Sequence, residues 1–286
     1  MSDHSSSAPN SLPSTPPALA AHDALAMPSS SRLPPLGIAS LSLGSCEQHP
    51  LARKVRAAAE HGFTSIELFD LDWQQYRDAH AREHGFGTPA VEGDEASISA
   101  AHALAALLQQ HGVEVSCWQP LRNFEGWVAD DDRREAREYA RGILDIMPIL
   151  GTDLLLCCTT STPAPRTTPS LERTVEDLRW LADLAASYSP PIRIMYEGLS
   201  FGAHRQSWQD AYEVVETANR PNFGLCLDSF NTLALEWADP YSVDGRLSPD
   251  VDAKLERNMD ELVRRVPGSK VRPALSRPFA LSRSAS

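Results

Sequence analysis

From residue 36 onward, short apolar segments alternate with longer segments of helical periodicity. We expect strands at residues 36–43, 65–69, 113–119, 152–159, 192–197 and 223–228. We expect helices at residues 50–61, 97–111, 131–150, 171–187, 207–219 and 249–266. Six βα units in this order predict an α/β fold with a parallel sheet, which is either doubly wound or closed into a barrel.

Several details favour the barrel. Gly62 and Gly112 each follow a helical segment and precede a strand, where a left-handed residue commonly ends a helix. The strands are nearly continuous apolar runs, as in parallel sheets covered on both faces. No GxGxxG or Walker A motif follows the first strand, which removes the usual reason to choose a nucleotide-binding sheet. In a barrel, the active site lies at the carboxyl ends of the strands.

Composition divides the chain into three parts. Residues 1–35 are rich in Ser, Pro and Ala and predict a disordered leader. Residues 36–271 hold the barrel units, and residues 272–286 form a tail outside the barrel. The leader lacks the basic and apolar regions of a secretory signal, and no apolar run approaches the roughly 20 residues of a membrane helix. We therefore expect a cytoplasmic protein that spans no membrane.

Charge and cysteine content limit the partners. The formal net charge of −12 argues against a nucleic-acid-binding surface and favours a small-molecule site. Five cysteines form no CxxC pair, and we expect all of them to be reduced thiols.

Two carboxylates finish apolar strands. Glu197 ends the fifth strand and Asp228 ends the sixth. Two carboxylates on adjacent strands suit a hard divalent cation such as Mg²⁺ or Mn²⁺. The alternative is that each caps the next helix or pairs with a nearby arginine, Arg193 or Arg205.

Other polar side chains follow the same strand ends. Glu67 and Gln119 end the second and third strands, and Arg122 stands where its guanidinium could pair with a substrate carboxylate. Histidines that are candidates for proton transfer occur in the expected loops, at His49, His80 and His204. A surface or capping role is the alternative for each histidine, and a solvated loop position is the alternative for Arg122.

Several motifs then identify a family. They are IASLSLGSC at 38–46 with His49, SIELF at 65–69, WQP at 118–120, MYEGL at 195–199, NRPNFGLCLDSFN at 219–231 and ADP at 238–240. Together they resemble fungal 3-dehydroshikimate dehydratases, which belong to the xylose isomerase-like TIM barrels. The resemblance covers about residues 36–271.

The resemblance implies a divalent metal, Mg²⁺, Mn²⁺ or Co²⁺, held by Glu, Asp, Gln or His, and Glu on strands five to eight. Glu197 and Asp228 match the first two positions. The implied reaction is the loss of water from 3-dehydroshikimate to give protocatechuate, in quinate and shikimate catabolism. The cation polarises the ketone while a base removes the neighbouring proton.

The chain departs from the family pattern twice. Related bacterial enzymes carry a catalytic His three residues after the metal-binding Asp, and here that position is Asn231. Acid or base work would then fall to His49 or His204. After Val271, Pro273 and Pro278 oppose a central strand, so strands seven and eight are expected to be missing together with the third and fourth ligands.

An open barrel of this kind exposes strand edges that can pair with a second copy, giving a homo-oligomer. We expect the chain alone to be weakly active at best. Two other functions fit the sequence: a sugar or keto-acid isomerase or epimerase of the same barrel family, and a non-catalytic remnant that still binds the metabolite.

Overall fold

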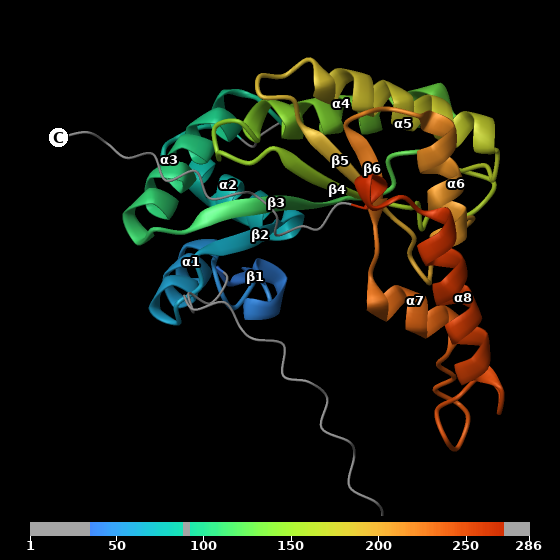
Figure 1. Cartoon of the computed structure of the whole chain (residues 1–286). Coiled ribbons are helices and arrows are strands. Elements are labelled where there is room, and N and C mark those ends of the chain that lie inside the picture. Colours follow the sequence, from blue (N-terminus) through green and yellow to red (C-terminus); the bar gives the residue numbers. More distant parts are fainter. Residues whose placement is uncertain (1–34, 88–91, 272–286) are drawn as a thin grey trace, which may run out of the picture. The chain divides into compact units, whose positions relative to one another are not determined.

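The computed structural model describes residues 35–87 and 92–271, which Figure 1 traces. The predicted tail and all but the last residue of the predicted leader lie outside these ranges. The described residues form one sheet of six strands in the order of the sequence, and every neighbouring pair is parallel. The strands are β1 (Gly37–Ala39), β2 (Ser65–Phe69), β3 (Glu114–Leu121), β4 (Leu154–Cys158), β5 (Arg193–Glu197) and β6 (Phe223–Cys226). This is the predicted α/β architecture.

Helices connect the strands, and α3, α4, α5 and α6 lie along one side of the curved sheet in Figure 1. The α-helices are α1 (Leu51–Glu60), α2 (Asp70–Glu83), α3 (Glu95–His111), α4 (Asp130–Ile146), α5 (Leu171–Ala186), α6 (Trp208–Ala218), α7 (Ser229–Glu236) and α8 (Val251–Arg265). Two 3₁₀ turns are η1 (Ser40–Leu43) and η2 (Gly268–Lys270). Within the described ranges, we find no helix with the length and apolar character that crossing a bilayer requires.

Alternation along the strands creates two different faces, because successive side chains point to opposite sides of a sheet. Ile194 and Tyr196 on β5 belong to the large core between the sheet and the helices. Met195, between them, belongs to a smaller cluster with Cys117, Leu154, Leu156 and Cys158. The smaller cluster lines the inner face, and Glu197 follows Met195 on that face.

Three details of the predicted elements were wrong. The first strand ends at Ala39, and the chain then turns into η1. His80 lies on α2, although the segment after the second strand was expected to be a loop. A further helix, α7, begins immediately after Asp228. The left-handed conformations expected at Gly62 and Gly112 are confirmed, with φ of 81° and 63°.

A buried ion pair holds the start of the barrel together. The ammonium of Lys54 on α1 donates to Asp72 Oδ1 on α2 at 2.7 Å and to the carbonyls of Ser40 and Gly44 at 2.9 and 2.6 Å. The Ser40 hydroxyl donates to the other oxygen of Asp72 at 2.6 Å and accepts from the Phe69 amide. The side chains of Lys54 and Asp72 are 1% and 0% exposed, so neither charge has water as an alternative partner.

We predict that Lys54→Met lowers the free energy of unfolding by about 3–5 kcal/mol, because it leaves the Asp72 carboxylate buried without its cation. The double variant Lys54→Met with Asp72→Leu should recover part of this loss. Urea denaturation measures both. Lys254→Met, which removes an ion pair to Asp250 between half-exposed side chains, is the matched control and should change stability little. Equal losses in the two single variants would contradict the prediction.

Candidate active site

The carboxylate of Glu197 lies at the inner, carboxyl end of the sheet. Its residue pairs with Cys158 on β4 and Cys226 on β6, so the three positions form one row across the strands. The Cys158 thiol donates to Glu197 Oε2 at 3.2 Å. Glu197 is buried, whereas Asp228, two residues beyond β6, is partly exposed. The fold therefore presents one buried and one accessible carboxylate from adjacent strands.

Burial raises the pKa of Glu197 to about 7, a value to which the negative charges of Asp228 and Glu67 contribute and which hydrogen bonds from Cys158 and Asn231 moderate. The charge of Glu67 also raises the pKa of the Cys117 and Cys226 thiols. Glu67 pairs with Cys117 in the register of β2 and β3, so it lies on the same inner face. These interactions show that Glu67, Glu197 and Asp228 share one electrostatic environment. Like charges that repel each other at the mouth of a site favour a cation between them.

Asn231 joins the two strand ends. Its side-chain oxygen accepts hydrogen bonds from the Ser200 amide and hydroxyl at 3.0 and 3.1 Å. These two hydrogen bonds fix the orientation of the amide. Its Nδ2 therefore points to Asp228 and donates to Oδ2 at 2.7 Å. The same amide lowers the pKa of Glu197. Asn231 is thus a neutral donor that orients Asp228 and lies close to Glu197.

Asp228 also caps α7, accepting from the amides of Phe230 and Asn231 at 2.8 and 3.4 Å. Capping was the alternative that the sequence left open for this residue, and the structure shows it. It leaves room for a second role, because a carboxylate has about four lone-pair sites. The other alternative, a pair between Glu197 and Arg193 or Arg205, is not formed: Arg193 pairs with Asp153 and Arg205 donates to the Pro169 carbonyl.

Three of the other buried carboxylates have ion pairs, whereas none is found for Asp70 or Glu125 among the described residues. Asp72 pairs with Lys54, Glu92 with Arg77, and Asp177 with Arg133 and Arg137. Glu197 has no such ion pair among the described residues, and its raised pKa reflects that. Two oxygen donors of this kind fit a hard divalent cation. Within residues 35–87 and 92–271 there is no group of three or more His, Cys, Asp and Glu side chains that would hold a metal unaided, so this pair is a partial donor set.

The second and third strands add polar groups beside the pair. Gln119 Nε2 donates to Glu67 Oε2 at 2.9 Å, which joins the two residues predicted at these strand ends. The Arg122 guanidinium lies over the Phe69 ring at 5.0 Å and its charge lowers the pKa of Asp70 against the larger effect of burial. Arg122 is exposed just after β3, and no carboxylate among the described residues accepts a hydrogen bond from its N–H groups.

The three candidate histidines are dispersed. His204 Nε2 lies 2.8 Å from Thr167 Oγ1 in the loop after β4, and burial lowers its pKa, with the charge of Arg205 adding to the effect. The ring of His49 packs against Gly44 and fills the space that a Cβ there would need. The φ of 102° at Gly44 also favours glycine. His80 on α2 stacks on His84 at 4.0 Å. No described hydrogen bond joins any of these three rings to Glu197 or Asp228.

Sequence reasoning missed Glu125. Its carboxylate is buried in the loop after β3, where it accepts from the Thr160 amide at 2.8 Å and from the Tyr196 hydroxyl at 3.0 Å. It therefore ties together segments that follow β3, β4 and the end of β5. Burial raises its pKa to about 7, and its Oε2 has no hydrogen-bond partner among the described residues. The available signal was an isolated acid between aromatic residues, Phe124 and Trp127, after a strand.

Comparison with known proteins agrees with this geometry. The family model of the xylose isomerase-like TIM barrel matches residues 55–265. The chain is 34% identical over 239 residues to the 3-dehydroshikimate dehydratase of Neurospora crassa, covering 82% of this chain and 65% of that protein. It is 33% identical over 206 residues to the 3-dehydroshikimate dehydratase of Pseudomonas aeruginosa, covering 72% of this chain and 28% of that protein.

Among solved structures, a crystal structure of IolI protein with a bound zinc atom matches with a TM-score of 0.56 at 18% identity, covering 77% of this chain and 84% of that one. That level of identity shows a shared fold. The chain spans about two thirds of the length of the Neurospora relative and less than a third of the Pseudomonas relative.

Glu125 generates a pH prediction. Its folded-state pKa lies above the unfolded value, so the native state holds the proton more tightly, and the associated stability is lost as pH rises from about 4.5 through about 7. Glu125→Gln keeps the shape without the charge. The free energy of unfolding of the variant should exceed that of the parent by an amount that grows by on the order of 3 kcal/mol between pH 4 and pH 8. Urea titrations across this range measure the difference, and a pH-independent difference would contradict it.

Proposed function

Because the chain belongs to the xylose isomerase-like TIM barrel family, we propose that it takes part in removing water from 3-dehydroshikimate to give protocatechuate. The observation that carries the proposal is the similarity to two 3-dehydroshikimate dehydratases, together with a buried Glu197 and an adjacent Asp228 at the strand ends. Residues 36–271 would form the barrel part that holds the site.

In this proposal Glu197 and Asp228 are metal ligands. Mg²⁺, Mn²⁺ and Co²⁺ are the candidate cations, since the two donors are carboxylate oxygens. A protein of the same fold also binds a divalent metal, zinc. A bound divalent cation supplies a Lewis acid that polarises a ketone oxygen. Asn231 orients Asp228 through its amide, which makes it a positioning residue in place of the proton-transfer role that a histidine would have there.

The substrate-binding role falls to Arg122, Glu67 and Gln119. Arg122 presents an exposed guanidinium, stacked on Phe69, which suits the carboxylate of the substrate. Gln119 and Glu67 hydrogen-bond to each other and retain acceptor oxygens for substrate hydroxyls. These contacts would bind and orient a small polar ring next to the carboxylate pair.

Proton transfer is assigned to an imidazole, with His49 and His204 as the two candidates. The lowered pKa of His204 keeps its ring neutral near pH 7, as a base requires. A homo-oligomer is also part of the proposal, because among the described strands β1 pairs with β2 alone and leaves its other edge for a second copy.

The activity test uses the full chain with 3-dehydroshikimate and added Mg²⁺, Mn²⁺ or Co²⁺, and follows the absorbance of protocatechuate. We expect weak turnover that needs the cation and falls at least about 100-fold in Glu197→Gln and Asp228→Asn, since each loses a charged ligand. Asp228→Asn keeps the cap of α7, because Asn also caps helices well.

The matched control is Glu114→Gln, which removes an exposed carboxylate at the opposite end of the same sheet. It should leave turnover unchanged. Turnover that survives chelation of the cation, or that is equal in Glu197→Gln and the parent, would contradict the proposed role of the pair.

Asn231→Ala separates positioning from ligation. It removes the amide that orients Asp228, and we expect Mn²⁺ affinity to fall by roughly 10–100-fold with both ligands still present. Electron paramagnetic resonance of free Mn²⁺ measures the affinity. Asn258→Ala is the control, because it removes a comparable amide–carboxylate hydrogen bond, to Glu236 at 2.9 Å, away from the site. Unchanged Mn²⁺ affinity in Asn231→Ala would show that Asn231 has no positioning role.

A further inference from the structure

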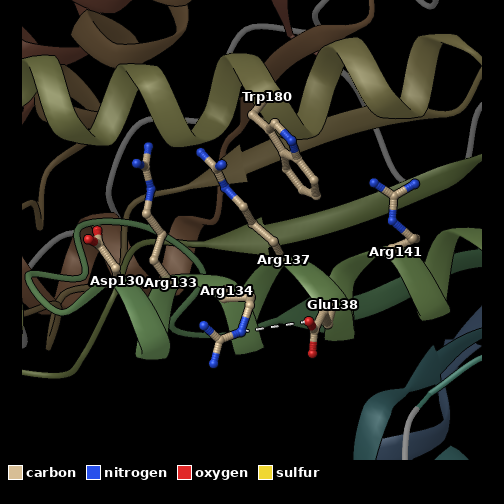
Figure 2. A pocket seen from close by; sticks show the side chains of 7 residues that line it. All are labelled: Asp130, Arg133, Arg134, Arg137, Glu138, Arg141 and Trp180. Carbon is tan, nitrogen blue, oxygen red and sulfur yellow. Dashed lines mark ion pairs between the residues drawn. The ribbon is translucent and has the colours of Figure 1, made fainter.

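A cavity lined mainly by charged side chains lies on the outer surface, between α4 and α5, and Figure 2 shows it. Its volume is about 430 Å³. It is lined by Asp130, Arg133, Arg134, Arg137, Glu138, Arg141 and Trp180. Arg133, Arg137 and Arg141 are spaced four residues apart on α4, so they lie on one face of the helix at intervals of about 6 Å along its axis.

The first two arginines of this stripe have structural partners. Arg133 Nε donates to Asp177 Oδ1 at 2.5 Å, and Arg133 Nη2 pairs with Glu176 Oε1 at 2.9 Å. Arg137 shares Asp177 Oδ1 at 3.2 Å. Asp177 is buried on α5 and also accepts from the Gly126 amide. This network is sufficient to fix α4 to α5, and two guanidinium groups share its one buried carboxylate.

Arg134 faces a different direction. In Figure 2 it points away from α5 toward Glu138, and it pairs with Asp131 at 2.7 Å and with Glu138 at 3.9 Å. Its charge is therefore offset by neighbours on its own helix. The positive charge that remains in the cavity comes from Arg137 and Arg141.

Arg141 has no structural partner of this kind. Its guanidinium lies 5.8 Å from the centre of the Trp180 ring, and that of Arg137 lies 4.8 Å from the same ring. No hydrogen bond or ion pair of Arg141 is found among the described residues, and the buried Nε of Arg137 likewise has no acceptor there. The two guanidinium groups thus converge on one indole ring with unused N–H donors.

We propose that this cavity binds a diphosphate group, either as free pyrophosphate or as part of a nucleoside diphosphate. Guanidinium groups match phosphate oxygens with paired N–H donors, and two of them about one helical turn apart suit two linked phosphates. The half-buried indole of Trp180 contacts both guanidinium groups and stacks with Phe124, so it positions the two cations and leaves no free face for a base. Asp130 lines the cavity at the start of α4, whereas Glu138 stands between Arg137 and Arg141 in the sequence and competes with the phosphates there.

The test is calorimetric titration of the full chain with pyrophosphate, ADP and inorganic phosphate at low salt, with Trp fluorescence as a second signal. We expect saturable binding of pyrophosphate and ADP, weaker by at least about tenfold for inorganic phosphate. Tighter binding of ADP than of pyrophosphate would identify the nucleotide as the ligand, and equal binding would identify the diphosphate alone.

Arg141→Gln should weaken binding by about tenfold or more, and because Arg141 is exposed the variant should fold as the parent does. Arg56→Gln, an equally exposed arginine on α1, is the matched control and should bind as the parent does. Glu138→Gln should tighten binding by about twofold to fivefold, since it removes a competing negative charge from the cavity.

The proposal would be overturned by an absence of saturable binding at millimolar pyrophosphate and ADP, or by equal affinity in Arg141→Gln and the parent. A gain in Glu138→Gln is a change that loss of folding would not produce. The outcome is independent of dehydratase activity, because the cavity lies on the helical side of the sheet and the carboxylate pair on its inner face.

Discussion

The parallel register of β4, β5 and β6 decides what the inner face of this sheet can do. Cys158, Glu197 and Cys226 are aligned in one row, so a single residue of slippage would move Glu197 into the apolar core between sheet and helices. The large core on the outer face resists that slippage, because each strand buries Ile, Leu or Tyr side chains against it. Burial of apolar side chains on the outer face therefore holds the Glu197 carboxylate in place on the inner face.

That carboxylate is costly to keep charged. Three other buried acids, Asp72, Glu92 and Asp177, are compensated by Lys54, Arg77 and Arg133, whereas Glu125 accepts from an amide and a hydroxyl. Glu197 instead faces another carboxylate and accepts from a thiol, which is a weak donor. Under the proposed function, a divalent cation bound by Glu197 and Asp228 would lower the free energy of this buried charge.

Regular elements were predictable from the sequence because their patterns are local. The strand at Ser65–Phe69 matches the prediction residue for residue, since the apolar Ile66, Leu68 and Phe69 follow closely after Gly62, which ends the preceding helix. Helix α2 was missed because its stability comes from distant partners. Asp72 pairs with Lys54, and Trp73 donates to Glu92, a residue nineteen positions away. No local periodicity records such contacts, and the same reason hides the buried role of Lys54.

The two carboxylates were predictable as strand-end residues, but their supporting contacts were not. Asp228 is fixed by the backbone amides that it caps, and Glu197 by its place in the sheet, so both are oriented before any ligand binds. Asn231 then couples them to the loop after β5 through Ser200. A histidine at this position could exchange a proton, whereas an amide can only orient its neighbours. Under the proposed function, proton transfer therefore belongs to another side chain.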